Sequence, residues 1–179
     1  MNYKAALLKQ NRKIFSTDDL ALLWNISNRN TLLTTIKRYL NKNILYSLRK
    51  GLYSVAPPET LSPYSLGTAY IAGFCYLSLQ TILSKHGLIN QYPRVITLIG
   101  SRSRSFSIAG NSYLCQKMAP KYLNNLEGIE LYRSFPIATI ERAIVDMLYY
   151  NPNFYFDQDI SPYLDRVREI QQQVFNKNI

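Results

Sequence analysis

Polar and basic side chains between Asn28 and Lys50 have the types and spacing needed to bind nucleic acid. Asparagine and threonine hydrogen-bond to base edges, whereas lysine and arginine pair with phosphates. At 100° per residue, Thr31, Thr34 and Arg38 lie on the side of a helix opposite its apolar face, with Asn30 and Lys37 beside them. The candidate contact residues are Asn28, Arg29, Asn30, Thr31, Thr34, Lys37, Arg38, Arg49 and Lys50.

These candidates divide into two roles. The first five, up to Thr34, are candidates for base edges because the N-terminal residues of a recognition helix enter the groove deepest. Arg29 also lies toward the core side of the helical wheel, which leaves its role open. The four cations from Lys37 onward are expected to meet phosphates, or a minor groove in the case of Arg49 and Lys50.

The charge distribution favours an anionic partner for this region. The 179 residues carry a net charge of +10. Up to Ala56 there are ten Lys or Arg against two acids, which gives +8, and from Pro57 onward eleven against nine, which gives +2. No acid occurs from Thr31 to Pro58, whereas a merely solvated face usually mixes both signs. A DNA backbone explains the pattern better than a solvated surface does.

The elements around this stretch predict a winged helix-turn-helix over residues 1–56. Ser16, followed by Asp18 and Asp19, should cap a helix that runs to Trp24. A turn then leads to a second cap, either Ser27 or Asn28. The other expected elements are a first helix over 2–12, a core face of Leu32, Leu33, Ile36, Tyr39 and Leu40, and strands over 44–48 and 52–55 around a turn with two exposed cations, Arg49 and Lys50.

Residues 57–179 predict a mixed α/β domain, so the fold class is α+β. The prolines after Ala56 suggest the boundary. Thr139 should cap a helix with Arg142 and Asp146 on its outer side, one turn apart and able to pair. The remaining expected elements are helices over 66–73, 76–86 and 159–177, strands over 93–99 and 128–135, and a hairpin of 105–108 with 112–116.

The residue types do not predict an enzyme, a metal site or a cofactor. The only histidine, His86, precedes Gly87, where it can bond the last carbonyls of a helix. Cys75 and Cys115 are spaced like neither a metal knuckle nor a redox pair, so we expect buried thiols. No stretch is long and apolar enough for a signal peptide or a membrane span, which predicts a cytoplasmic protein.

Six short segments together resemble the AbiEi-type antitoxins of type IV toxin-antitoxin (abortive infection) systems. They span about Ile14 to Tyr149, and their order and spacing are more specific than any one of them. The segments are Phe15-Ser16-Thr17-Asp18-Asp19-Leu20-Ala21, Arg49-Lys50-Gly51-Leu52-Tyr53, Tyr76-Leu77-Ser78-Leu79, Ser84-Lys85-His86-Gly87-Leu88, Pro136-Ile137-Ala138-Thr139-Ile140-Glu141-Arg142-Ala143 and Val145-Asp146-Met147-Leu148.

The resemblance implies an N-terminal winged helix that represses its own operon and a C-terminal domain that counteracts a nucleotidyltransferase-like toxin. The chain departs from the family in having Arg142 where members commonly have lysine, and in a shorter C-terminal region. Two alternatives remain open. One is a winged-helix regulator with a ligand-sensing or dimerisation domain and no toxin. The other is a metal-dependent nucleic-acid-processing enzyme that uses acids such as Glu127, Glu130 and Asp146. The operator and the oligomeric state do not follow from the sequence.

Overall fold

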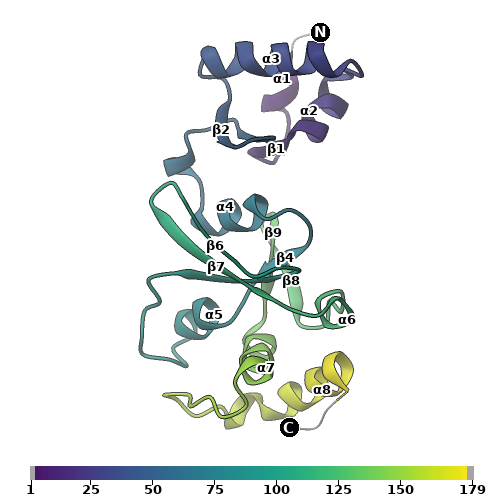
Figure 1. The fold of residues 1–179 in the computed structure, drawn as a ribbon. Helices are drawn as coiled ribbons and strands as arrows, with labels where there is room; N and C mark the ends of the chain where they lie inside the picture. The colour runs from purple at the N-terminus through teal and green to yellow at the C-terminus, as the bar shows by residue number, and fades with distance from the viewer. Residues whose placement is uncertain (1–2, 177–179) are drawn as a thin grey trace. The chain divides into compact units, whose positions relative to one another are not determined.

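The computed structural model describes residues 3–176 and has a mixed α and β fold (Figure 1). The chain divides into two compact units, Met1–Tyr70 and Ile71–Ile179. Each unit contains one sheet, three-stranded in the first and six-stranded in the second. The domain boundary was expected after Ala56, whereas the first unit extends to Tyr70. Residues 57–70 therefore belong to the first unit.

The first unit packs three helices against a small antiparallel sheet. The sheet order is β1-β3-β2, so the strand nearest the N-terminus pairs with the last one. Its core is built around Trp24 and Phe15, together with Leu7, Leu20 and Leu32 from the first three helices. The elements are α1 (Tyr3–Leu8), β1 (Ile14–Ser16), α2 (Thr17–Trp24), α3 (Arg29–Asn41), β2 (Tyr46–Arg49), β3 (Leu52–Ser54), a 3-10 turn (Pro58–Thr60) and α4 (Pro63–Tyr70).

Both helix starts predicted around the turn are confirmed. The Ser16 hydroxyl accepts from the Asp19 amide at 3.0 Å, and the Asp19 carboxylate accepts from the Ser16 amide at 2.7 Å. This reciprocal capping box satisfies two donors at the start of α2. Asn25 ends α2 in the left-handed conformation, and the Asn28 side chain caps α3. The four-residue connection, 25–28, fixes how α3 leaves α2.

Two expectations for the first unit need correction. No strand was expected before α2, but Ile14 to Ser16 form β1 because their backbone pairs with β3. The first helix ends at Leu8 instead of reaching Arg12, and the expected start at Asn2 lies outside the described residues. Strands β2 and β3 lie within the expected ranges except for Arg49, where a bulge brings that residue opposite Leu52.

The second unit is a six-stranded mixed sheet in the order β6-β7-β5-β4-β9-β8. Helices α5 and α7 pack on each other over one face of the sheet, and α8 packs on α7 (Figure 1). The elements are β4 (Cys75–Leu77), α5 (Gln80–Lys85), β5 (Ile96–Gly100), β6 (Arg104–Ile108), β7 (Asn111–Lys117), α6 (Pro120–Leu123), β8 (Ile129–Tyr132), β9 (Phe135–Ala138), α7 (Ile140–Tyr150), a 3-10 turn (Ser161–Tyr163) and α8 (Leu164–Phe175).

The hairpin of β6 and β7 is confirmed, and so is the Thr139 cap of α7. Ala109 and Gly110 both have positive φ, which suits the tight two-residue connection between Ile108 and Asn111. The Thr139 hydroxyl accepts from the amide of Arg142 at 3.2 Å. The last helix covers the middle of its expected range, and Lys177 lies outside the described residues.

Two segments of the second unit were assigned wrongly. Tyr76 and Leu77 belong to a central strand instead of opening a helix, because β4 pairs with both β5 and β9. The helix begins only at Gln80. The single strand expected over 128–135 is two strands, since the chain turns at Arg133 and Ser134 and continues through Pro136 as β9. In the first case the pairing with strands distant in the chain decides the conformation, and in the second the pairing of β8 with the adjacent β9 does.

Candidate nucleic-acid interface

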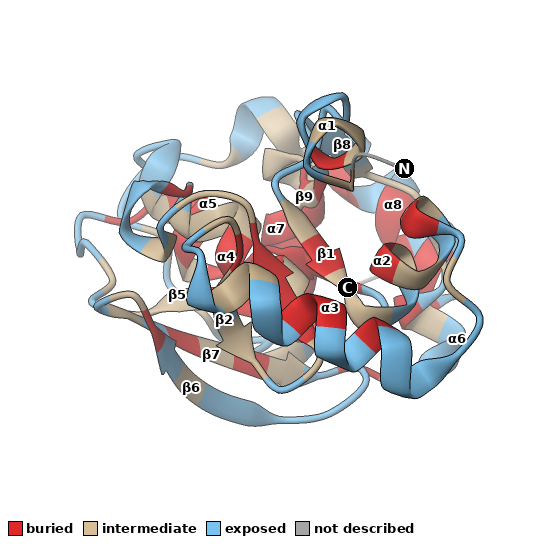
Figure 2. Cartoon of the chain, turned by 90° about the horizontal axis from the view of Figure 1, so that it is seen from above, coloured by how far each residue is buried: buried red, intermediate tan, exposed pale blue. Residues whose placement is uncertain are grey.

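Helix α3 presents one continuous exposed face. Its buried side is formed by Leu32, Thr35 and Ile36, and Figure 2 shows buried and exposed residues alternating along it. The exposed residues include the predicted Asn30, Thr31, Thr34, Lys37 and Arg38, together with Leu33 and Asn41. Among the described residues no ion pair includes a residue of α3. Its cations therefore remain available to an anionic partner.

The N-terminus of α3 adds to this positive character. Arg29 is exposed, so its position toward the core side of the wheel does not bury it. The first turn contains no acid to offset the positive end of the helix dipole. Asn30 makes no side-chain hydrogen bond within residues 3–176, which leaves its amide free to pair with a base edge.

The side chains of Asn28 and Thr31 are less available for hydrogen bonds to bases than the sequence predicted. The Asn28 Oδ1 accepts from the Thr31 amide at 3.0 Å and from the Thr31 hydroxyl at 3.3 Å. Asn28 is thus committed to capping the helix, as are many N-cap residues. The hydroxyl of Thr31 must give up this bond before it donates to a base.

Leu33 belongs to the exposed face and not to the core face on which it was expected. Its side chain is 43% exposed. It lies three residues after Asn30 and four before Lys37, so all three share one side of the helix. The core side is centred instead near Leu32 and includes Thr35, which lies on the other flank of Leu32 from Leu33. An exposed leucine among polar side chains suits an apolar contact, such as a thymine methyl group.

Arg49 is drawn away from the turn that was expected to expose it. Its Nε donates to the carbonyl oxygen of Tyr70 at 3.0 Å, and its guanidinium lies 5.6 Å from the centre of the Tyr70 ring. The side chain is half-buried, so the expectation of two exposed cations in this turn is wrong for Arg49. The sequence around Arg49 does not predict this contact, because Tyr70 lies 21 residues further along the chain.

Lys50 is the exposed cation of the β2–β3 turn. Gly51 follows with a φ of +81°, and its carbonyl accepts from the amide of Thr17 at 3.0 Å, which anchors the turn beside α2. Lys42, which the sequence did not single out, is also exposed, at the C-cap of α3. It could have been found as the next cation in the same acid-free segment.

The motif residues of the second unit meet in a buried polar cluster. Arg142 and Asp146, expected on the outer side of α7, are both fully buried and paired at 2.8 Å. The Ser78 hydroxyl donates to Asp146 at 2.7 Å, and Arg142 donates to the Tyr76 hydroxyl at 2.8 Å. The same guanidinium donates to the carbonyls of Asn125 and Glu127. The cluster therefore ties β4, α7 and the segment before β8 together.

Electrostatics keep this cluster hydrogen-bonded. Burial raises the pKa of Tyr76 well above its usual range, and nearby Asp146 adds to the effect, so the phenol stays protonated. Burial also raises the pKa of Asp146, while the Arg142 guanidinium acts in the opposite direction. Both carboxylate oxygens of Asp146 accept hydrogen bonds from within the cluster.

The acids named for a metal-dependent enzyme do not gather. Asp146 is enclosed by Arg142, whereas the Glu127 carboxylate lies near the surface and pairs with Arg166. Glu130 is exposed on β8. Within residues 3–176 there is no group of three or more His, Cys, Asp or Glu side chains that could hold a metal ion. His86 is exposed at the C-cap of α5, where its backbone amide bonds the Ile82 carbonyl.

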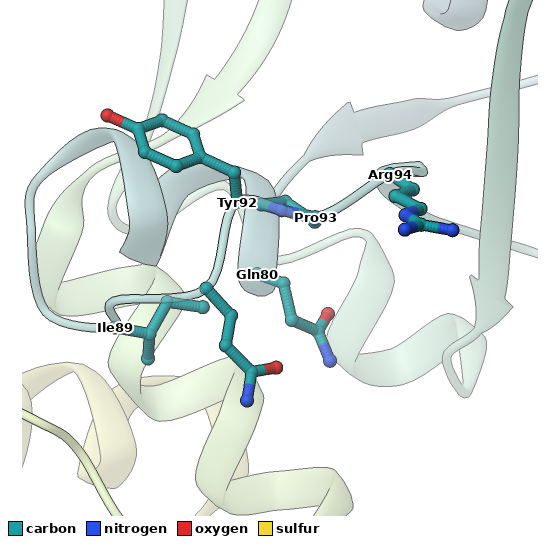
Figure 3. A pocket seen from close by; sticks show the side chains of 6 residues that line it. Gln80, Ile89, Tyr92, Pro93 and Arg94 are labelled. Carbon is teal, nitrogen blue, oxygen red and sulfur yellow. The ribbon is translucent and has the colours of Figure 1, made fainter.

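A pocket of about 460 Å³ lies beside the start of α5. Gln80, Ile89, Gln91, Tyr92, Pro93 and Arg94 line it. The Gln80 Oε1 atom is buried without a hydrogen-bond partner. Figure 3 shows the Tyr92 ring and the Arg94 guanidinium pointing away from Gln80. The polar ends therefore do not converge on one point, as they do in most ligand sites.

No protein-family model matches the sequence, and a search of curated proteins finds no similar sequence. Among residues 3–176, none of the helices has the length and apolar character needed to cross a membrane.

Proposed function

We propose that this chain is the DNA-binding antitoxin of a type IV toxin-antitoxin system, which represses its own operon and counteracts a nucleotidyltransferase-like toxin. In this proposal the first unit is a winged helix-turn-helix with α3 as its recognition helix. The observation that carries it is the exposed face of α3, which combines amide, hydroxyl and cationic groups with no acid. Groups of this kind read base edges and bind phosphates.

The arrangement of the first unit supports the same proposal. Helices α2 and α3 are joined by a short capped turn, and two strands follow α3 as a β2–β3 hairpin whose β3 also pairs with β1. A winged helix places its second helix in the major groove and its hairpin on the adjoining backbone. Asn30, Leu33 and Thr34 would then face bases, while Lys37, Arg38 and Lys50 would face phosphates. Repression follows if the bound protein occupies its own promoter.

The toxin-opposing half of the proposal rests on the resemblance in the second unit. The segments around Tyr76, Arg142 and Asp146 carry that resemblance, and in this chain their side chains form the buried polar cluster. Their role is therefore to build the domain. A surface that opposes a toxin would use exposed residues of that unit, not these buried side chains.

A gel-shift titration of the full chain tests the DNA-binding half. The chain is titrated against its own upstream region and against a scrambled duplex, each at two salt concentrations. We expect tighter binding to the native duplex and a steep loss of affinity with salt. Equal binding to the two duplexes would remove autoregulation from the proposal.

Co-expression tests the antitoxin half separately. If a nucleotidyltransferase gene lies next to this one, its expression should arrest growth, and the full chain should restore it. A second candidate function is a winged-helix regulator that senses a ligand and has no toxin. The one observation in its favour is the buried Gln80 Oε1 atom without a hydrogen-bond partner beside the pocket, although the other polar ends there do not converge. DNA binding without any rescue of growth would support that second candidate instead.

A further inference from the structure

Strand β8 is an open edge of the six-stranded sheet. It pairs with β9 on one side, and within the described residues no strand lies on its other side. Soluble proteins usually protect such an edge with lysine, proline or a bulge, because its free amides and carbonyls invite another strand. The β8 sequence, Ile-Glu-Leu-Tyr, has none of these protections. Leu131 is 75% exposed there.

The backbone of Leu131 faces this open edge. In an antiparallel pair, opposite residues either exchange two N–H···O bonds or exchange none. Leu131 lies opposite Pro136, which has no amide hydrogen to give. The two residues therefore form a non-hydrogen-bonded pair, and the amide and carbonyl of Leu131 point away from β9. One strand could be added at this position.

The side chains of β8 place charge along the edge. Successive residues alternate between the two faces, so Glu130 and Tyr132 lie on the same face. Two cations flank the Tyr132 ring: Lys85 Nζ lies 5.5 Å and the Arg133 guanidinium 5.4 Å from its centre. Glu130 is exposed and has no ion pair within residues 3–176. The edge thus carries the Glu130 carboxylate and, two residues later, the Tyr132 ring with its two neighbouring cations.

We infer that two copies of this chain pair antiparallel through β8, about a two-fold axis at Leu131. In that register Leu131 meets its own copy, and Glu130 lies directly opposite Tyr132 of the other copy. Each Glu130 is then beside the two cations around that ring, and symmetry makes the contact twice. Directly opposed residues of opposite charge stabilise a strand pair.

The neighbouring registers with the same symmetry are unfavourable. A two-fold axis perpendicular to the sheet keeps each residue on its own face, so the next allowed axes are at Glu130 and at Tyr132. The first would place the two Glu130 carboxylates opposite each other. The second would bring together both sets of Lys85 and Arg133. Like charges opposite one another destabilise the pair, so charge selects the axis at Leu131.

Complementary charge reversal tests this pairing. One variant is Glu130→Lys, and the other combines Lys85→Glu with Arg133→Glu. Each alone places like charges opposite in both contacts, so we expect self-association to weaken roughly tenfold or more. Mixed together, they restore opposite charges in both contacts, and the mixture should associate. Sedimentation velocity over a range of concentrations measures all three samples, and circular dichroism checks their folding.

Two further measurements complete the test. Glu59→Lys is the matched control, because Glu59 is exposed in the first unit, and its self-association should equal that of the unaltered chain. Leu131→Cys should form a disulfide with its own copy under mild oxidation, whereas Leu126→Cys, outside β8, should not. A chain that stays monomeric at all concentrations, or a mixture that fails to associate, would overturn the inference. The pairing does not depend on DNA binding, since every residue in it belongs to the second unit.

Discussion

Arg142 and Asp146 form an ion pair one turn apart on α7, with no solvent exposure of either side chain. Removing two charges from water costs several kcal/mol, which such a pair recovers only if further hydrogen bonds satisfy its remaining groups. Here the hydroxyls of Tyr76 and Ser78 and two backbone carbonyls provide those bonds. The pair therefore holds α7, β4 and the segment before β8 in one arrangement.

Removal of Arg142 should destabilise the second unit strongly. Arg142→Met would leave the Asp146 carboxylate buried without its counterion, which typically costs about 3–5 kcal/mol. Urea unfolding followed by far-ultraviolet circular dichroism measures the change. Arg142→Met with Asp146→Leu removes both charges and should recover a large part of the loss.

A surface ion pair supplies the matched control for Arg142. Arg166 bonds Glu127 and Glu169 but is about half exposed, so Arg166→Met should cost much less stability than Arg142→Met. Equal losses for Arg142→Met and Arg166→Met would show that the buried pair contributes little. That result would leave Tyr76 and Ser78 as the main polar contacts between β4 and α7.

The sequence predicted correctly those helix starts and turns whose hydrogen-bond partners lie within a few residues of each other. Ser16 with Asp19, Asn28 and Thr139 each cap a helix through a residue three positions away, and all three helix starts are confirmed. The Ala109-Gly110 turn joins its two strands directly, and that hairpin is confirmed too. In each case the sequence contains both partners of the interaction within a few residues.

The errors occurred where a distant partner decides the outcome. Tyr76 and Leu77 were predicted to be helical, yet they form part of β4 because β5 and β9 lie on either side of it. Arg142 read as a surface residue because buried arginine is rare, and its buried partners at Tyr76 and Asn125 are far away in the chain. Arg49 was misplaced for the same reason, since Tyr70 holds it.

Acidification should weaken the capping box at α2. Burial raises the pKa of Asp19, but the hydrogen bonds from Ser16 and the Arg12 guanidinium together lower it by more. The pKa therefore lies below its ordinary 3.8. A carboxyl with a lowered folded pKa adds stability that is fully present above its unfolded pKa and lost as pH falls through the folded pKa. The first unit should therefore lose this contribution only below about pH 4.

Asp19→Asn tests that pH dependence. We expect it to cost about 0.3–1 kcal/mol at neutral pH, and the difference from the unaltered chain should vanish in acid. Trp24 is the only tryptophan and is buried in the first unit, so its fluorescence reports this unfolding. Asp18→Asn, at an exposed position, is the control and should show a smaller pH-dependent difference. A constant difference at all pH values would contradict the assignment.

The two thiols should be inert in the folded chain. Cys75 and Cys115 are buried and form no disulfide within the described residues, and burial raises the pKa of Cys75 to about 12 and that of Cys115 to about 11. Because the thiolate is the reactive form, alkylation at pH 8 should be negligible until the protein unfolds. Mass spectrometry after maleimide treatment, with and without urea, measures this. Rapid labelling of either residue without urea would contradict the burial.

Lys37 and Arg49 should differ in their effects on DNA binding. Lys37→Ala removes an exposed phosphate candidate, so it should weaken binding to all duplexes and reduce the salt slope by about 1. Arg49→Ala breaks the bond to the Tyr70 carbonyl, so its main effect should be lower stability of the first unit. Gel shifts at several salt concentrations, paired with Trp24 unfolding curves, separate the two. A stable Arg49→Ala protein with a reduced salt slope would return Arg49 to the phosphate-contacting set.

Leu33 should contribute to base recognition more than to folding. Its neighbour Leu32 is 4% exposed, so Leu32→Ala should cost about 2–5 kcal/mol of stability, whereas Leu33→Ala, at a surface position, should cost less than about 1 kcal/mol. If Leu33 packs on a thymine methyl beside the base that Asn30 reads, Leu33→Ala should reduce discrimination at one A·T pair only. Binding to duplexes substituted one base pair at a time measures this. A uniform loss over all duplexes would mean that Leu33 positions the helix without contacting a particular base. Asn30→Ala is the comparison, because it should cost about 1–3 kcal/mol of binding free energy at one base pair only.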